Sequence, residues 1–199
     1  MAWHVPAGRG RVQQTHAWRV CRVDRLGSQL AVTDYHGLEH EIALSDVAVP
    51  TAPVREEIER ELEARAGRRA FDEAFSAAGE VRRPEGWIPA VGERVVVQFV
   101  PTSWYLAEVL ARDDERVRVR FVGGTSDDRY VPASHVAPHP AGQPAGAPPP
   151  VDAWVLVPSA RETERWQPAR VVRSGAELEV ALRGGDQRKL PARQVIVVE

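Results

Sequence analysis

Two histidines four residues apart, His36 and His40, stand beside the carboxylate of Glu39 and are the residues most like a metal site. Zinc takes imidazole, thiolate and carboxylate ligands, and Cys21 is the single thiol of the chain. The stretch YHGLEH at 35–40 reads as a turn, so it lacks the helical geometry that would bring both rings to one ion. No second pair completes the ligand count, and the sequence predicts neither a metal nor a cofactor.

Three arginines alternate with apolar residues in the stretch RVRVRF at 116–121. Arg116, Arg118 and Arg120 share one face of the strand that this alternation predicts, where they could contact a nucleic-acid backbone. Five acidic residues flank the stripe: Asp113, Asp114, Glu115, Asp127 and Asp128. The formal net charge is −2. Local neutralisation on a solvated face is therefore favoured, with nucleic-acid binding as the alternative.

Catalytic motifs are missing from the sequence. No serine stands in a nucleophile elbow, and no glycine-rich loop could cradle a phosphate. We therefore expect a protein with no catalytic residues. The opening MAWHVPAGRG lacks a signal-peptide core, and no apolar run approaches the roughly 20 residues that span a bilayer. Together with the lone cysteine, this predicts a cytoplasmic monomer that does not enter the membrane.

The sequence contains three similar units, which would form the strands that position these residues. The frame Trp, two residues, a small residue, one residue and Val occurs at 18–23, 104–109 and 166–171. After each frame come a turn, an alternating strand, glycine and a hydrophobic closing phrase. The closing phrases lie at 42–47, 131–136 and 190–195. Self-similarity at a period of a few tens of residues indicates repeated supersecondary units.

Each unit has an internal period of two, which predicts a small, strongly bent antiparallel barrel, with a plain β-meander as the alternative. The small residue and the valine of each frame share one face and should line the barrel interior. They are Cys21, Val23, Ala107, Val109, Ala169 and Val171. Trp18, Trp104 and Trp166 have the opposite parity, so we expect them to cover an open barrel end or the joint between units. A binding role for Trp104 stays open.

Two stretches interrupt the repeated units. Residues 52–78 show apolar positions at helical spacing, which predicts a helical connector. Gly67 weakens this helix, and a second helix is one way for the stripe to resume at Phe71. The Pro-rich stretch 137–150 is predicted to be an extended spacer that divides the last unit from the rest. Because barrels of about 50 residues are marginal alone, the first two are expected to pack together through the helix.

The predicted organisation is mainly β and has five parts. They are a divergent first barrel at 1–50, a helical connector at 51–86, a second barrel at 87–138, a Pro-rich linker at 139–150 and a third barrel at 151–199. The connector thus separates the first barrel from the second, and the linker separates the second from the third.

The middle unit is the most regular of the three. Between 91 and 136 it contains the phrases VGERVVVQF, WYLAEV, ERVRVRFVGG and DDRYVPASHV in that order. In this order they resemble a Tudor domain, a member of the Tudor, chromo and agenet group of SH3-like barrels. The resemblance is fainter over 151–199 and over the first unit. It implies three Tudor-like antiparallel barrels in tandem.

The resemblance also implies recognition of a protein or peptide. Many Tudor domains hold a methylated lysine or arginine in a cage of aromatic rings, and each well-placed ring contributes about 0.5–2 kcal/mol. The matching positions are Phe99, Tyr105 and Phe121, with Asp127 or Asp128 as a candidate anionic partner. Packing of Phe99 and Phe121 in the core is the competing interpretation.

The other two units lack the rings that a cage needs. The matching positions of the third unit are near Ser159, at Gln167 and at Leu182, and in the first unit only Tyr35 is suitable. The leading interpretation is a non-catalytic adaptor whose middle barrel presents the recognition surface. Nucleic-acid binding through the arginine stripe and a purely structural scaffold are the alternatives.

Overall fold

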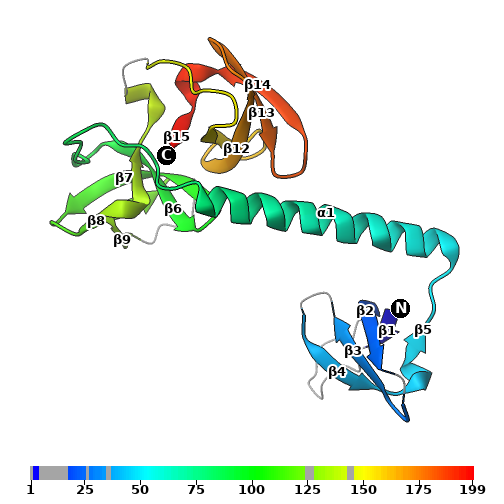
Figure 1. Ribbon diagram of the computed structural model, residues 1–199. Helices are drawn as coiled ribbons and strands as arrows, with labels where there is room; N and C mark the ends of the chain where they lie inside the picture. Colours follow the sequence, from blue (N-terminus) through cyan, green and yellow to red (C-terminus); the bar gives the residue numbers. More distant parts are fainter. Residues whose placement is uncertain (1, 5–17, 26, 35–36, 124–127, 143–145) are drawn as a thin grey trace. The chain divides into compact units, whose positions relative to one another are not determined.

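The computed structural model describes residues 2–4, 18–25, 27–34, 37–123, 128–142 and 146–199 (Figure 1). Strands dominate these residues, and α1 (Ala52–Ala77) is the one α-helix among them. The chain divides into two compact units, Met1–Arg65 and Ala66–Glu199. None of the described helices has the length and apolar character needed to cross a membrane.

The first unit contains an antiparallel sheet of five strands in the order β4-β3-β2-β1-β5. The strands are β1 (Ala2–His4), β2 (Trp18–Arg25), β3 (Leu30–Asp34), β4 (Glu39–Ile42) and β5 (Val47–Ala48), and the 3-10 turn η1 (Leu44–Asp46) precedes β5. Cys21 packs with Leu30, Val32 and Ile42 in a small core. The side chain of Trp18 lies outside the described residues, as do Tyr35 and His36.

The second unit contains two further sets of five strands, which share one 10-stranded sheet. The first set consists of β6 (Arg94–Val100), β7 (Ser103–Arg112), β8 (Arg116–Phe121), β9 (Arg129–Pro132) and β10 (Val136–Pro138). The second set consists of β11 (Trp154–Pro158), β12 (Arg165–Arg173), β13 (Glu177–Leu182), β14 (Gln187–Pro191) and β15 (Ile196–Val198). We call these sets the middle sheet and the last sheet.

All three sets of strands share one topology. Each set places its fifth strand beside its first and then runs through the second, third and fourth, as in β10-β6-β7-β8-β9. The predicted mainly β fold class, with three repeated antiparallel units, is confirmed by this order. One detail differs from a closed barrel. No ladder joins β4 to β5, β9 to β10 or β14 to β15 in the part of the chain that the structure describes, so each set is an open sheet.

The closing phrases have a conformation that the period of two does not reveal. In each of them a strand ends and a single 3-10 turn follows, and a short fifth strand begins at the last residue of the phrase or directly after it. The turns are η1, η2 (Ala133–His135) and η4 (Ala192–Gln194); η3 (Pro140–Gly142) lies in the Pro-rich stretch. In η2 the backbone N–H of Val136 donates to the carbonyl of Ala133. This turn redirects the chain so that the fifth strand reaches the first.

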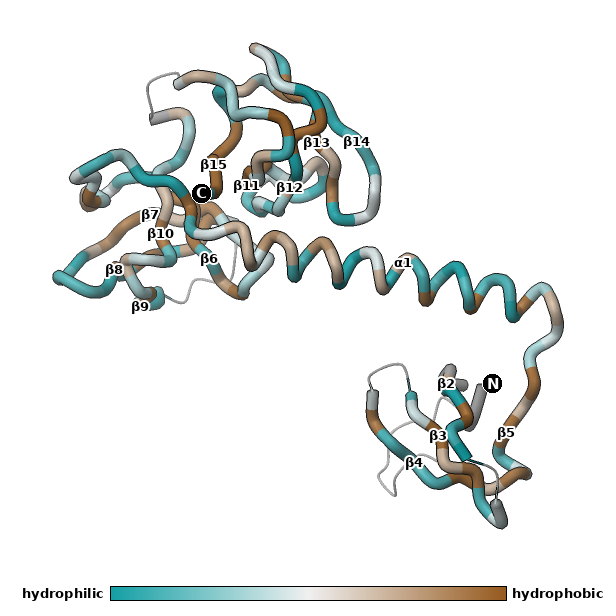
Figure 2. The backbone as a smooth tube through the Cα atoms, viewed as in Figure 1, coloured by the Kyte–Doolittle hydropathy of each residue, from teal (hydrophilic) through white to brown (hydrophobic). Residues whose placement is uncertain are grey.

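The repeated small residues and valines lie where the sequence predicts. Ala107, Val109, Ala169 and Val171 are fully buried, the first two in the core of the middle sheet and the others in that of the last sheet. Figure 2 shows hydrophobic residues within strands such as β13 and β15. Neighbours such as Val119 and Val180 fill the rest of each core, so a larger side chain at the alanine positions would overpack it.

The tryptophans join the middle and last sheets. β7 pairs with β12, and Trp104 lies directly opposite Trp166 in this ladder. Both side chains are only 4% exposed, in a cluster that also holds Leu156 and Ile196. The middle sheet therefore packs with the last one. The expectation that the Pro-rich stretch divides the last unit from the middle one is wrong. The two sheets pack together because their two indoles bury a large apolar surface between them.

Helix α1 is continuous through Gly67, so the apolar stripe resumes at Phe71 on the same helix and not on a second one. A single helical glycine costs only about 1 kcal/mol, and ion pairs support the helix on both sides of it. They join Glu61 to Arg65 and Arg69 to Glu73, each at 2.8 Å. These spacings of four residues place the partners on neighbouring turns. The glycine therefore weakens the helix without ending it.

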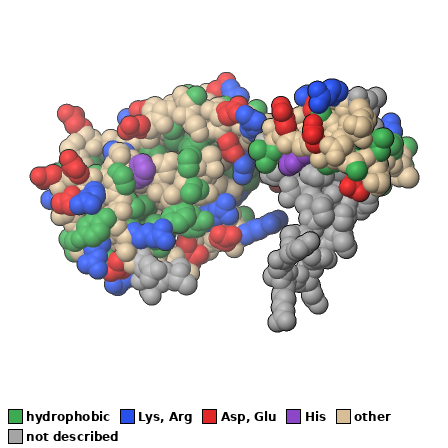
Figure 3. Space-filling model, turned by 90° about the horizontal axis from the view of Figure 1, so that it is seen from below, with side chains coloured by type: hydrophobic (Ala, Val, Ile, Leu, Met, Phe, Trp, Pro, Cys, Tyr) green, Lys and Arg blue, Asp and Glu red, His purple; other side chains and the backbone are tan. Residues whose placement is uncertain are grey.

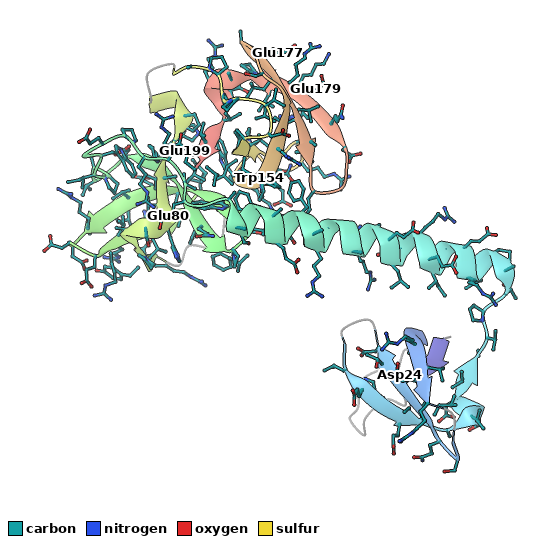
Figure 4. The ribbon with its side chains drawn as sticks, viewed as in Figure 1. Asp24, Glu80, Trp154, Glu177, Glu179 and Glu199 are labelled. Carbon is teal, nitrogen blue, oxygen red and sulfur yellow. The ribbon has the colours of Figure 1, made fainter. Side chains whose placement is uncertain are left out.

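The end of α1 packs on the last sheet. Phe71 and Phe75 meet the ring of Trp154 edge-on, with centroids 4.8 and 5.6 Å away. Beyond the helix the backbone N–H of Glu80 donates to the carbonyl of Glu199 at 2.7 Å, and the reverse bond measures 2.8 Å. Figure 4 labels Trp154, Glu80 and Glu199. The segment after the helix thus extends the edge of the sheet beside β15.

Candidate aromatic site

Three aromatic rings meet at one end of the strands of the middle sheet. Phe99 stands near the end of β6, Tyr105 near the start of β7 and Phe121 at the end of β8. Because neighbouring strands are antiparallel, these three positions lie at the same end of the sheet. The register places Ala107 opposite Phe121 and Val97 opposite Tyr105. A register shift between Gln98 and Val100 marks the point where Phe99 leaves the regular ladder.

The rings stand nearly perpendicular to one another. The Phe99 centroid lies 5.9 Å from those of Tyr105 and Phe121, which are 6.3 Å apart. The interplanar angles are 85°, 87° and 87°. Phe99 is 50% exposed, whereas Tyr105 and Phe121 are partly buried, and Phe121 also packs against the core of the middle sheet. Three ring planes at right angles form a corner whose faces can attract a cation.

A cation of the chain itself already lies against this corner. The guanidinium carbon of Arg129 is 5.1 Å from the centroid of Phe99. Arg129 opens β9 opposite Val119 of β8, and residues opposite each other in a ladder share a face. Phe121 is two residues beyond Val119, so Arg129 and Phe121 belong to the same face of the sheet. The corner therefore holds a cation–π contact within the chain.

The arginine stripe is matched by acidic groups. Arg118 Nη2 and Arg120 Nε pair with the two carboxylate oxygens of Asp128, at 2.8 and 3.1 Å. Arg116 lies 3.8 Å from Asp113 and 5.4 Å above the ring of Tyr130. Figure 3 shows basic and acidic side chains intermixed on the face that it displays. This arrangement is the local neutralisation expected from the sequence, and a stripe so paired offers little free positive charge to a phosphate backbone.

The structure describes one of the two aspartates proposed as anionic partners, Asp128, and not the other. Asp127 lies outside the described residues. Asp128 is described, but its carboxylate is 20% exposed and held by two arginines, so it is already compensated. Asp113, at the far end of the stripe, has its pKa lowered because the backbone N–H groups of Arg116 and Glu115 donate to its carboxylate. That carboxylate stabilises a turn.

Trp104 does not line the aromatic corner. Its side chain is 4% exposed and lies in the joint with the last sheet, opposite Trp166. Its assignment as a ligand-binding residue is corrected to the structural role that the sequence also allowed. Parity is the physical reason, because Trp104 and Tyr105 are consecutive in one strand and point to opposite faces.

One acidic residue of the last sheet, Glu164, lies near the end of β8, where the sequence did not suggest it. Glu164 lies in the turn before β12, and its carbonyl accepts a hydrogen bond from the backbone N–H of Leu106 at 2.6 Å. A Cβ built on Gly123 would lie 3.1 Å from Cδ of Glu164. Gly123 follows Phe121 by two residues. No local sequence pattern predicts that Glu164 lies near the end of β8, since it belongs to another repeat. The pairing of β7 with β12 brings it to that position.

The residues weighed as metal ligands make a different contact. His40 Nε2 lies 3.3 Å from the buried carboxylate of Asp34 in the first unit. His36 lies outside the described residues. Among the residues that the structure does describe, no group of three or more metal-ligating side chains comes together. The contact between His40 and Asp34 belongs to the packing of β3 against β4.

No protein-family model matches the chain, and no curated protein matches its sequence. Among solved structures, it is similar to the crystal structure of ADCP1 tandem Agenet domain 3-4, with 12% sequence identity and a TM-score of 0.36. The match covers 66% of this chain and 86% of that one.

Proposed function

We propose that the middle sheet binds a methylated lysine or arginine side chain of a protein or peptide partner at Phe99, Tyr105 and Phe121. The observation that supports this proposal is the set of three nearly perpendicular rings at one end of the middle sheet. Methylation spreads the charge of an ammonium or guanidinium group and weakens its hydration, so ring faces compete well with water for it. The chain then acts as a binding adaptor without catalysis.

The partly exposed ring of Phe99 also favours a binding role over a purely structural scaffold. A side chain that served only the core would gain most from complete burial, yet half of Phe99 faces solvent. Nucleic-acid binding has less support, because Arg118 and Arg120 share the carboxylate of Asp128. The aromatic corner remains the surface with the clearest chemical preference.

A titration with modified amino acids tests this proposal. The full chain, labelled with nitrogen-15, is titrated with lysine and arginine that are acetylated and amidated at their backbone groups, with and without side-chain methyl groups. We expect the methylated forms to shift the amides around Phe99, Tyr105 and Phe121, and the unmethylated forms to shift them less. Equal or absent shifts for all ligands would reject binding at the rings and leave the scaffold interpretation.

Replacing Arg129 with alanine is expected to tighten this binding by about twofold to tenfold. The guanidinium occupies the face of Phe99 and repels a second cation, so its removal frees that ring. The titration is repeated with this variant and with Arg112→Ala, which removes the same charge at the opposite end of β7. If Arg129→Ala binds no better than Arg112→Ala, then Arg129 does not compete for the corner.

A further inference from the structure

A cavity of about 320 Å³ lies where the end of helix α1 meets the middle and last sheets. Side chains from α1 and the segment after it, from the β6–β7 hairpin, from η2 and from β15 line this cavity. Trp104 is one of them, whereas Tyr105, the next residue, belongs to the aromatic corner. Consecutive residues of a strand point to opposite faces, so the cavity and the corner lie on opposite faces of the hairpin.

The inner wall of the cavity is apolar. Phe75, Trp104 and Val198 contribute to it, and all three belong to the buried cluster at the joint of the two sheets. The indole nitrogen of Trp104 is itself buried, without a hydrogen-bond partner among the described residues, so this ring offers no donor to a ligand. Such a wall suits the hydrocarbon part of a long side chain.

The polar side chains around the cavity are mainly hydrogen-bond acceptors. The hydroxyl of Ser76 donates to a carbonyl of its own helix at 2.8 Å, and the amide nitrogen of Gln98 donates to a carbonyl of the β6–β7 turn at 3.0 Å. The oxygen atoms of both side chains can therefore accept from a ligand. Glu80 adds an exposed carboxylate, and its ion pair with Arg83 is long, at 3.9 Å, so a better placed cation can compete for it.

The end of helix α1 makes the potential of the cavity more negative. The helix ends at Ala77, and Phe75 and Ser76 of its last turn line the cavity. The carbonyl end of a helix carries the negative end of its dipole, and no basic side chain in the last turn compensates it. The helix end and the carboxylate of Glu80 therefore both favour a cationic ligand.

We infer that this cavity binds an unmodified arginine side chain of a protein partner. Arginine combines a hydrocarbon stem, which suits the wall formed by Phe75 and Val198, with a planar guanidinium whose five N–H groups match a rim of acceptors. A guanidinium is also more weakly hydrated than an ammonium group, so it loses less on entering a partly apolar cavity. The cavity lies on the opposite face of the hairpin from the aromatic corner, so this inference does not rest on the proposed function.

The test is a titration of the full chain, labelled with nitrogen-15, with arginine and citrulline that are both blocked at their backbone groups. Citrulline has a planar end group of similar shape without the charge. We expect arginine to shift the amides of Gly79 and Ser134 and to bind roughly fivefold more tightly than citrulline. Glu80→Gln should weaken arginine binding by about twofold to fivefold and leave citrulline unchanged. Glu85→Gln removes a carboxylate of the same segment that does not line the cavity, and it should change neither ligand.

A titration of Tyr105→Ala with the same arginine ligand separates the cavity from the aromatic corner. The shifts at Gly79 and Ser134 should persist in this variant, because its substitution lies on the other face of the hairpin. Their loss would overturn the inference, since the arginine would then be bound at the rings. Equal affinity for arginine and citrulline, or unchanged amides at Gly79 and Ser134, would overturn it as well. Each of these results leaves the binding of methylated ligands at the corner to its own test.

Discussion

Replacing Trp166 with alanine is expected to lower the free energy of unfolding of residues 66–199 by about 3–5 kcal/mol. The indole is 4% exposed and lies opposite Trp104, in a cluster that includes Phe75 from helix α1 and Ile196 from β15. Removing it leaves a cavity where two sheets and the helix meet. Neighbours held in three different elements cannot collapse together to fill it, so the cost falls in the upper range for core residues.

Urea denaturation followed by the amide signals of Val109 and Val180 measures this effect in the middle and last sheets separately. Both sheets should lose stability together, because the tryptophan pair belongs to both. Tyr130→Ala provides the control: its ring is 57% exposed on β9, and its removal should change stability by less than about 0.5 kcal/mol. A loss confined to Val180, or one no larger than that of Tyr130→Ala, would contradict the shared core.

The strands could be predicted from the sequence because each carries its own signal. The alternation in RVRVRF predicts a strand at 116–121, and β8 has these bounds. The repeated small residue and valine predict a narrow interior, which Ala107 and Ala169 occupy fully buried. Such patterns depend only on which face of a strand meets the core, and that preference is written within a few consecutive residues.

The partnership between the sheets could not be predicted in the same way. The Trp frame shows that Trp104 and Trp166 are equivalent, but equivalence does not say that they meet. Their ladder joins residues more than 60 positions apart in the sequence, beyond a Pro-rich stretch that reads as a spacer. The position of Glu164 depends on this long-range pairing and was therefore missed. The ring positions came from the family resemblance, whose order of strands carries that spatial information.

Truncation of Tyr105 is the most direct prediction about the aromatic corner. Tyr105→Ala removes one of three perpendicular walls and should weaken binding of a methylated lysine by about tenfold or more, because each ring contributes about 0.5–2 kcal/mol and the remaining two enclose the cation less completely. Tyr105→Phe keeps the ring and loses only the hydroxyl, so its affinity should stay within about twofold of the wild type if the ring face is what binds.

The pair of variants distinguishes a ligand contact from damage to the sheet. Tyr105 is only partly buried and stands near the start of β7, so the alanine variant should keep the amide spectrum of Val109 and the rest of the core. Tyr130→Ala, which removes an exposed ring from β9, should bind as the wild type does. Wild-type affinity in Tyr105→Ala would mean that the perpendicular rings are a packing arrangement, since a cation held by ring faces must respond to the loss of one of them.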